Sequence, residues 1–216
     1  MRNYEITMEI AGPFAMWSRP DTGATPTSYP VPTWSAAKGI FESVAFFSDG
    51  KAWIRPVKVQ ICRPKWQKGG ELFFQHYTNN YRGPLRKSGK DNFQFTTLIL
   101  VDVCYRLYGH VENGSGRHLR HGDNPPHALQ AIFQRRLQKG QCHKTPTLGW
   151  NEFVPSYWGP FRENGLFQTE RDLDVNVNVI SMLSQVFSRA VCGSYSPRFT
   201  QGEGALIKEG ELRYAQ

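Results

Sequence analysis

The chain has 216 residues, of which 39% are hydrophobic, and its formal net charge is +8. This length suits one domain with a large core, or one domain with a smaller appendage. No run of about 18 uncharged apolar residues occurs, which argues against a membrane span, and Glu5 and Glu9 interrupt any signal-peptide pattern. We therefore expect a cytoplasmic protein without a membrane partner, and the basic balance points to a polyanionic partner.

The first elements follow from hydrophobic periodicity. Apolar residues alternate from Tyr4 to Ile10 and predict a strand that Gly12-Pro13 should end, followed by a long Gly- and Pro-rich loop over residues 12–32. Apolar residues at helical spacing from Trp34 to Phe47 then predict a core-facing helix. Thr33 or Ser35 is expected to cap it, and the turn residues 48–50 are expected to end it.

Residues 51–90 are strongly basic. They contain ten cations and one anion, Glu71. Six aromatic residues lie among these charges, namely Trp53, Trp66, Phe73, Phe74, Tyr77 and Tyr81. Cations that follow phosphates and flat rings that stack on bases are what single-stranded nucleic acid needs. The structural alternative is a solvated cationic face whose aromatic rings belong to the core.

The next elements predict a mixed α+β fold. Residues 57–61 read as a strand, residues 72–81 as a strand or a hairpin, and residues 93–111 as one long strand with a break or bulge. Strand, helix, strand, strand is half of a ferredoxin-like unit. Asn124 and Pro125 should start a second helix that stops at Gly140. Arg135 and Arg136 near its end either contact RNA or complement the helix dipole.

After Gly140 the sequence becomes β-like, with a hairpin signal at Glu209-Gly210. We therefore predict a domain over residues 1–145 and a small β-rich region over residues 146–216. The four cysteines, Cys62, Cys104, Cys142 and Cys192, are too far apart for a zinc or redox motif, so we expect reduced thiols. We expect no cofactor and no metal, because no carboxylate or thiolate joins His118, His121 and His127 at a recognised spacing.

Two segments resemble a known family. They are PTWSAAKGIFES over residues 32–43 and QRRLQKGQC over residues 134–142, the second followed by Leu148-Gly149 and Glu152-Phe153. Together with Asp102-Val103 they are similar to the CRISPR-associated Cas family five in its type I-C (Dvulg) form, a member of the RAMP superfamily. The resemblance covers roughly residues 1–155.

The resemblance implies a ferredoxin-like, RNA-recognition-motif-like N-terminal domain with a β-hairpin thumb, followed by a short β-rich part. It also implies an antiviral role. Members hold the 5′ handle of the CRISPR RNA (crRNA) in a type I interference complex, Cascade, beside backbone and large subunits that bring in target DNA. In the I-C form the same protein also cuts the precursor RNA (pre-crRNA) next to the repeat hairpin without a metal.

The expected cleavage residues are only partly matched. The family supplies a Tyr after the first helix and a Lys-His pair at the start of the second, but here Ala45 follows Val44 and the pair falls at Pro126-His127. His127 is the candidate general base or acid, with His118 and His121 as possible partners, since histidine titrates near neutrality. The alternative is that His127 only packs at the helix start, so endoribonuclease activity stays open.

The binding hypothesis names a set of contacts. The predicted RNA-binding residues are Trp34, Lys38, Arg55, Lys58, Arg63, Lys65, Trp66, Arg86, Lys87, Arg135 and Arg136, and Tyr77 is a further candidate for stacking. An alternative function is a non-specific single-stranded nucleic-acid-binding protein with no guide role, which the same mixture of rings and cations would suit.

Overall fold

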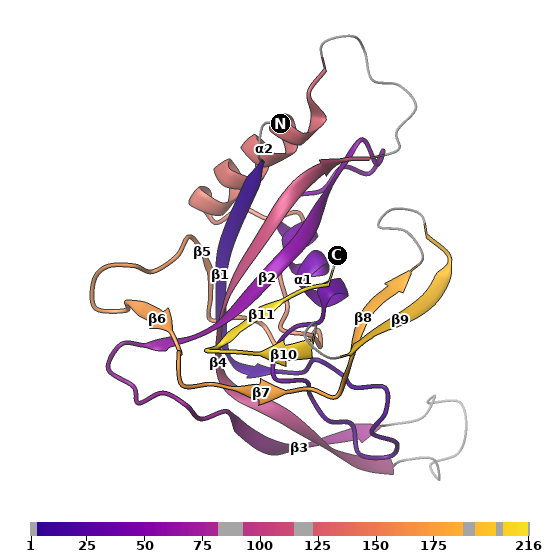
Figure 1. Cartoon of the computed structure of the whole chain (residues 1–216), viewed down its shortest axis with the longest axis vertical. Helices are drawn as coiled ribbons and strands as arrows, with labels where there is room; N and C mark the ends of the chain where they lie inside the picture. Colours follow the sequence, from indigo (N-terminus) through magenta and orange to yellow (C-terminus); the bar gives the residue numbers. More distant parts are fainter. Residues whose placement is uncertain (1–3, 82–92, 115–122, 188–192, 202–204, 216) are drawn as a thin grey trace.

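A computed structural model describes residues 4–81, 93–114, 123–187, 193–201 and 205–215. Its centre is an antiparallel sheet built from β1 (Glu5–Ala15), β2 (Ala52–Pro64), β3 (Phe73–Tyr81), β4 (Phe93–Asn113), β5 (Tyr157–Gly159), β6 (Thr169–Arg171) and β11 (Glu211–Arg213). The strand order is β11-β2-β4-β1-β5, with β3 paired to β4 and β6 paired to β2. The fold is therefore α+β, as predicted, and segments from the far end of the chain complete the sheet (Figure 1).

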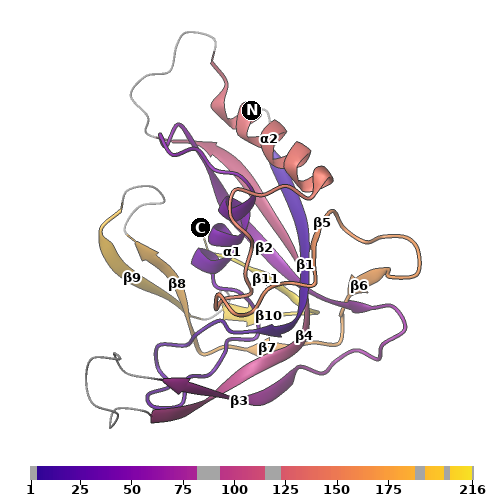
Figure 2. The ribbon, with the colours of Figure 1, turned by 180° about the vertical axis from the view of Figure 1, so that it is seen from behind.

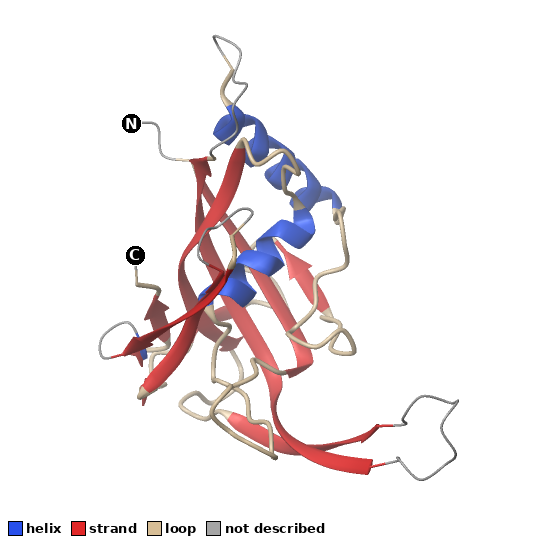
Figure 3. Ribbon diagram, turned by 90° about the vertical axis from the view of Figure 1, so that its right-hand side faces the viewer, coloured by secondary structure: helices blue, strands red, loops and turns tan. Residues whose placement is uncertain are grey.

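Two helices, α1 (Trp34–Val44) and α2 (Pro125–Lys139), cover one side of the sheet (Figure 3). The rings of Phe41 on α1 and Phe133 on α2 meet at 5.8 Å between centroids, and both are fully buried. Met8, Ile10 and Leu107 from the sheet belong to the same core. Neither helix in the described part of the chain is long and apolar enough to cross a membrane.

The predicted helix caps are confirmed. Thr33 Oγ1 accepts the Ala36 N–H at 3.1 Å, and Asn124 Oδ1 accepts the His127 N–H at 3.3 Å. Gly140 ends α2 with φ 63, a left-handed conformation that glycine adopts without strain. Local sequence therefore sets three of the four helix ends.

The fourth helix end was predicted wrongly. α1 stops at Val44, before the turn residues 48–50, because Ala45 is already extended at φ −152. Arg136 Nη1 donates to the Val44 carbonyl at 2.8 Å, and the His143 and Lys144 N–H groups donate to the Ser43 carbonyl at 2.8 and 2.9 Å. Donors from a distant segment thus satisfy the last carbonyls, which no local pattern reveals.

β1 was also predicted too short. It continues past Gly12-Pro13 to Ala15, with Phe14 opposite Val101 of β4. Proline has no backbone N–H to donate to a neighbouring strand. This is tolerated at Pro13 because β5 pairs with β1 only over residues 9–11, so β5 does not need a donor there.

The expected irregularity in the long strand is at Asp102, whose φ is 51. One edge of β4 pairs with β3 over residues 93–101 and with β2 over residues 105–113. Asp102 therefore marks the point where the β3–β4 hairpin leaves the body of the sheet, and Figure 3 shows this hairpin extending away from the rest.

The remaining strands are short. β7 (Val177–Asn178) pairs with β10 (Leu206–Ile207), and β8 (Ser181–Phe187) pairs with β9 (Tyr195–Gln201). The predicted turn at Glu209-Gly210 joins β10 to β11 with φ 49 and 70. Figures 1 and 2 show the β8–β9 hairpin and β6 on opposite sides of the molecule.

Candidate nucleic-acid interface

The β3–β4 hairpin carries the second half of the basic and aromatic segment that was predicted to bind RNA. Phe73 and Phe74 at its base are exposed, and most other side chains of β3 face solvent too. Tyr77 is half-buried, because its ring packs edge-on against Phe153 at 5.5 Å. The predicted contacts Arg86 and Lys87 lie outside the described residues.

Three predicted cations on β2 are held by carboxylates distant in sequence. Arg55 Nε pairs with Glu112 on β4. Lys58 Nζ lies 2.8 Å from Glu211 on β11 and 4.5 Å from the Tyr108 ring centroid. These cations are already neutralised within the fold.

Arg63 is held in the same way. Its guanidinium lies 3.1 Å from Glu170 and 3.7 Å from Asp172, and it also donates to the Gln67 carbonyl. Because β6 carries Glu170, the C-terminal segment neutralises the end of β2. Much of the positive charge counted along β2 therefore stabilises the sheet.

The pKa of Glu211 indicates how strongly these cations and carboxylates interact. Partial burial alone raises the pKa of a carboxyl group, but hydrogen bonds from Lys58 at 2.8 Å and Gln60 at 2.7 Å outweigh it. They lower the pKa of Glu211 to about 2. Lys58 is thus committed to a carboxylate that stays ionised at any physiological pH.

Lys65, Trp66 and Lys68 differ from the cations of β2. They lie in the connection between β2 and β3 and are exposed, and no described carboxylate lies within ion-pair distance of either lysine. The Trp66 side chain is 80% exposed. An exposed ring flanked by two ammonium groups that no described carboxylate engages is an arrangement of the kind that can stack on a base and contact its flanking phosphates.

Leu166 and Phe167 are exposed in a neighbouring loop, and sequence reasoning missed them. The Lys65 N–H donates to the Gln168 carbonyl at 3.2 Å, which brings the two loops side by side, and both apolar side chains are largely exposed. About 100 residues separate the two loops along the chain, so only the pairing of β6 with β2 reveals that they are neighbours.

The predicted contacts on α1 are mostly occupied. Trp34 is 6% exposed and packs against Trp53 at 6.1 Å between ring centroids, so its ring is not offered to a base. Lys38 pairs with Glu42 one turn later. On α2, Arg136 is engaged with the Val44 carbonyl, whereas Arg135 is exposed.

His127 is exposed at the first turn of α2 and has a phenol beside it. Its ring meets the Tyr4 ring edge-on at 6.2 Å between centroids. Asn124 joins the pair, because its Nδ2 donates to the Tyr4 hydroxyl at 2.5 Å while its Oδ1 accepts the His127 N–H. Sequence reasoning missed Tyr4, which lies more than 100 residues away, and the predicted partners His118 and His121 lie outside the described residues.

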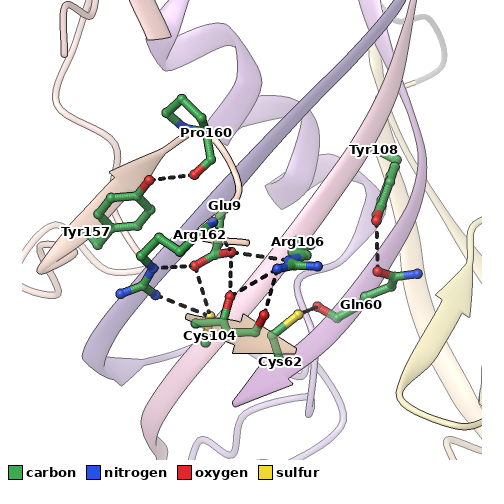
Figure 4. A network of polar contacts seen from close by, with 10 residues as sticks. Glu9, Gln60, Cys62, Cys104, Arg106, Tyr108, Tyr157, Pro160 and Arg162 are labelled. Atoms are coloured by element: carbon green, nitrogen blue, oxygen red, sulfur yellow. Dashed lines mark hydrogen bonds and ion pairs between the residues drawn. The ribbon is translucent and has the colours of Figure 1, made fainter. Parts of the chain in front are cut away.

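The sheet face opposite the helices is closed by a buried network around Glu9 (Figure 4). This fully buried carboxylate accepts from Arg106 Nε at 3.2 Å, Arg162 Nε at 2.5 Å and Thr169 Oγ1 at 2.7 Å. Arg106 also donates to the Thr169 carbonyl at 2.9 Å. The segment from β5 to β6 therefore covers this face, which is not available to RNA.

Two of the four cysteines, Cys62 and Cys104, belong to the same closed face. Cys62 and Cys104 are buried, free thiols, and Cys142 is free and half-buried; Cys192 is outside the described residues. The neighbouring thiol of Cys62, together with burial, raises the pKa of Cys104 well above its usual range. Within the described part of the chain, no cluster of His, Cys, Asp or Glu could hold a metal ion.

Known structures share the overall α+β fold of this chain. A crystal structure of a CRISPR-associated protein matches 98% of this chain and 92% of its own, with a TM-score of 0.65 and 18% identity. A functionally uncharacterized protein from Streptococcus mutans matches with the same values. At this identity the two matches establish the fold alone.

Sequence comparison identifies the family. The family model described as CRISPR-associated protein (Cas_Cas5), in its Cas5d form, matches residues 5–178, and the chain belongs to this family. The Thermus thermophilus protein named CRISPR pre-crRNA endoribonuclease Cas5d is 31% identical over 157 residues, covering 72% of this chain and 63% of that protein. Its namesake from Mannheimia succiniciproducens is 24% identical, covering 74% of this chain and 73% of that protein. The match thus spans under two thirds of the Thermus relative.

Proposed function

We propose that this chain binds crRNA, or its precursor, at the 5′ handle as a subunit of a type I Cascade complex. Membership of the Cas5d family supports the role, as do the names of two relatives. The observation that carries it is the exposed Lys65-Trp66-Lys68 loop, where a ring and two cations face solvent with no carboxylate from the described part of the chain beside them. Backbone and large subunits would be the protein partners, and target DNA would be reached only through the complex. The cytoplasmic location remains a prediction.

We further infer that the core is ferredoxin-like. With β3 set aside as part of the projecting hairpin, β1, α1, β2, β4, α2 and β5 follow a βαββαβ order, and the sheet order β2-β4-β1-β5 supports that topology. Residues 1–145 would form the RNA-binding domain. Residues 146–216 would form the β-rich region, whose strands β5, β6 and β11 join the same sheet. The β3–β4 hairpin would be the thumb.

Cleavage of pre-crRNA is the second part of the proposal. In metal-independent cleavage the 2′-oxygen attacks phosphorus and the bond to the 5′-oxygen breaks, leaving a cyclic phosphate and a 5′-hydroxyl. A base must take the 2′-hydroxyl proton and an acid must protonate the 5′-oxygen. His127 suits either role. The Tyr4 hydroxyl, which already accepts from Asn124, keeps its own proton for donation to phosphate oxygen.

The decisive experiment uses labelled repeat RNA in EDTA. We expect one cut beside the hairpin, abolished by His127→Ala and slowed by Tyr4→Phe, which keeps the ring but removes the hydroxyl. His143→Ala is the matched control, since His143 is also exposed but lies beyond the opposite end of α2. If wild-type protein binds the repeat without cutting it, cleavage is excluded and the binding role stands.

The alternative is a non-specific single-strand-binding protein. It suits the exposed rings equally well, so selectivity decides between the two functions. The handle-binding role predicts that the cognate repeat outcompetes a scrambled RNA of equal length at physiological salt. Equal affinity for both RNAs would favour the alternative.

A further inference from the structure

The β8–β9 hairpin is anchored to the rest of the molecule through β8. The Leu183 N–H donates to the Tyr29 hydroxyl at 3.1 Å, and the Val186 N–H donates to Ser35 Oγ at 3.3 Å. Ser35 Oγ in turn donates to the Ser184 carbonyl at 3.1 Å. β8 is therefore fixed to the body, and β9 is the outer strand (Figure 1).

The outer part of this hairpin exposes three aromatic rings. Phe187 is 54% exposed, Tyr195 75% and Phe199 51%. The register places Phe187 opposite Tyr195 and Leu183 opposite Phe199, so each pair shares a face. Leaving such rings in water is unfavourable unless a partner covers them.

A polar pair separates these two apolar pairs. Gln185 lies opposite Arg198, between the Leu183–Phe199 and Phe187–Tyr195 pairs, and the register shifts on both sides of it. A protein-docking surface usually has a continuous apolar centre. Rings alternating with an amide and a guanidinium instead match a strand of bases and phosphates.

Charge and backbone favour the same partner. Residues 181–201 contain two arginines, Arg189 and Arg198, and no Asp, Glu or Lys. Arg189 itself lies outside the described residues. Pro197 interrupts the donors along the edge of β9, which disfavours pairing with a strand from another protein.

We propose that the β8–β9 hairpin is a second contact site for single-stranded nucleic acid, which stacks on Phe187, Tyr195 and Phe199 while Arg198 contacts phosphate. It is separate from the Lys65-Trp66-Lys68 loop, because Figures 1 and 2 show β6 and this hairpin on opposite sides of the molecule. It does not depend on handle recognition or on cleavage.

The test measures binding of labelled oligouridylate and of oligothymidylate of equal length, neither of which forms a hairpin. Phe187→Ala with Tyr195→Ala should weaken binding by about tenfold or more, since each stacked base contributes substantially. Tyr195→Phe should bind normally. Arg198→Gln should reduce the salt dependence by roughly one phosphate contact, about 0.7 in the logarithmic slope.

Ile180→Ala is the matched control, because Ile180 is an exposed apolar residue just before β8 that has no ring. Ultraviolet crosslinking should attach nucleotide to the peptide containing Tyr195 and Phe199. If the double variant loses affinity for oligouridylate alone, the hairpin is an RNA site. If it loses affinity for both oligouridylate and oligothymidylate, the hairpin binds single-stranded RNA and DNA alike.

Unchanged binding by the double variant, with crosslinks confined to other segments, would overturn the hairpin site. So would intact nucleic-acid binding together with loss of co-purification with co-expressed Cascade subunits, since that result identifies a protein-docking surface. Selective binding of the repeat over a scrambled RNA tests handle recognition separately, so either idea can fail alone.

Discussion

Two surfaces of this molecule carry arginine, lysine and aromatic side chains and use them differently. On the sheet face opposite the helices, Arg106 and Arg162 surround the buried Glu9, and the segment from β5 to β6 closes over them. In the β2–β3 connection, Lys65 and Trp66 face solvent with no described carboxylate beside the lysine. Identical residue types thus stabilise the fold in one place and are free for a ligand in the other.

The difference lies in where the carboxylates are. Glu9, Glu112, Glu170 and Glu211 come from other strands and lie opposite cations of the central sheet. In the β2–β3 connection, by contrast, no described carboxylate lies within ion-pair distance of Lys65 or Lys68. A cation binds RNA well only when no internal carboxylate competes for it, so positive charge along the sequence overstates the interface.

The largest expected effect concerns the closed face. Glu9→Ala should lower the free energy of unfolding by about 3 to 5 kcal/mol, because it leaves two guanidinium groups without their buried partner. Denaturant titration would measure the loss. Glu163→Ala, next to Arg162 but exposed, should change stability by less than about 0.5 kcal/mol. A small loss for Glu9→Ala would mean that the network contributes little.

Two tryptophans from the same predicted set sharpen the comparison further. Trp34→Ala should cost about 3 kcal/mol or more of stability, since it empties a core position. Trp66→Ala should leave stability within about 0.5 kcal/mol and weaken binding of repeat RNA by about tenfold. Thermal unfolding and filter binding on both variants would test this. Equal RNA affinity of wild type and Trp66→Ala would remove Trp66 from the interface.

Local patterns predicted the elements well because their causes are local. Alternation predicted the strands, and Thr33, Asn124 and Gly140 marked helix ends through contacts made within a few residues. The end of α1 failed because its carbonyls are satisfied by Arg136 and His143, which are about 90 to 100 residues away. Periodicity carries no information about such distant donors.

The candidate sites depended more heavily on distant pairing. Trp66 was predicted and is exposed, but Trp34 was predicted and is buried, because a helical stripe does not reveal how the helix is covered. The loops that carry Trp66 and Phe167 become neighbours only through the sheet order, and the rings of Tyr4 and His127 only through the position of α2. Residue types could therefore be predicted more reliably than the constellations they form.

The smallest expected effect is a pH dependence at Glu211. Its pKa of about 2 lies below the ordinary 4.5, so the folded state prefers the ionised carboxylate. The resulting stabilisation is complete above pH 4.5 and is lost as the pH falls toward 2. It should be on the order of 1 kcal/mol, because its cationic partners reach solvent and are screened. Glu211→Gln should abolish it, so the stability difference from wild type should shrink between pH 6 and pH 2.

The same variant decides whether Lys58 belongs to the closed face or to the interface. Glu211→Gln removes the negative charge 2.8 Å from Lys58 Nζ and leaves the lysine in place. If Lys58 only stabilises the sheet, RNA affinity at neutral pH should equal that of wild type, as it should for the exposed control Glu163→Gln. A rise in RNA affinity for Glu211→Gln alone would mean that the carboxylate competes with phosphate for Lys58. The boundary between the two surfaces would then run through β2.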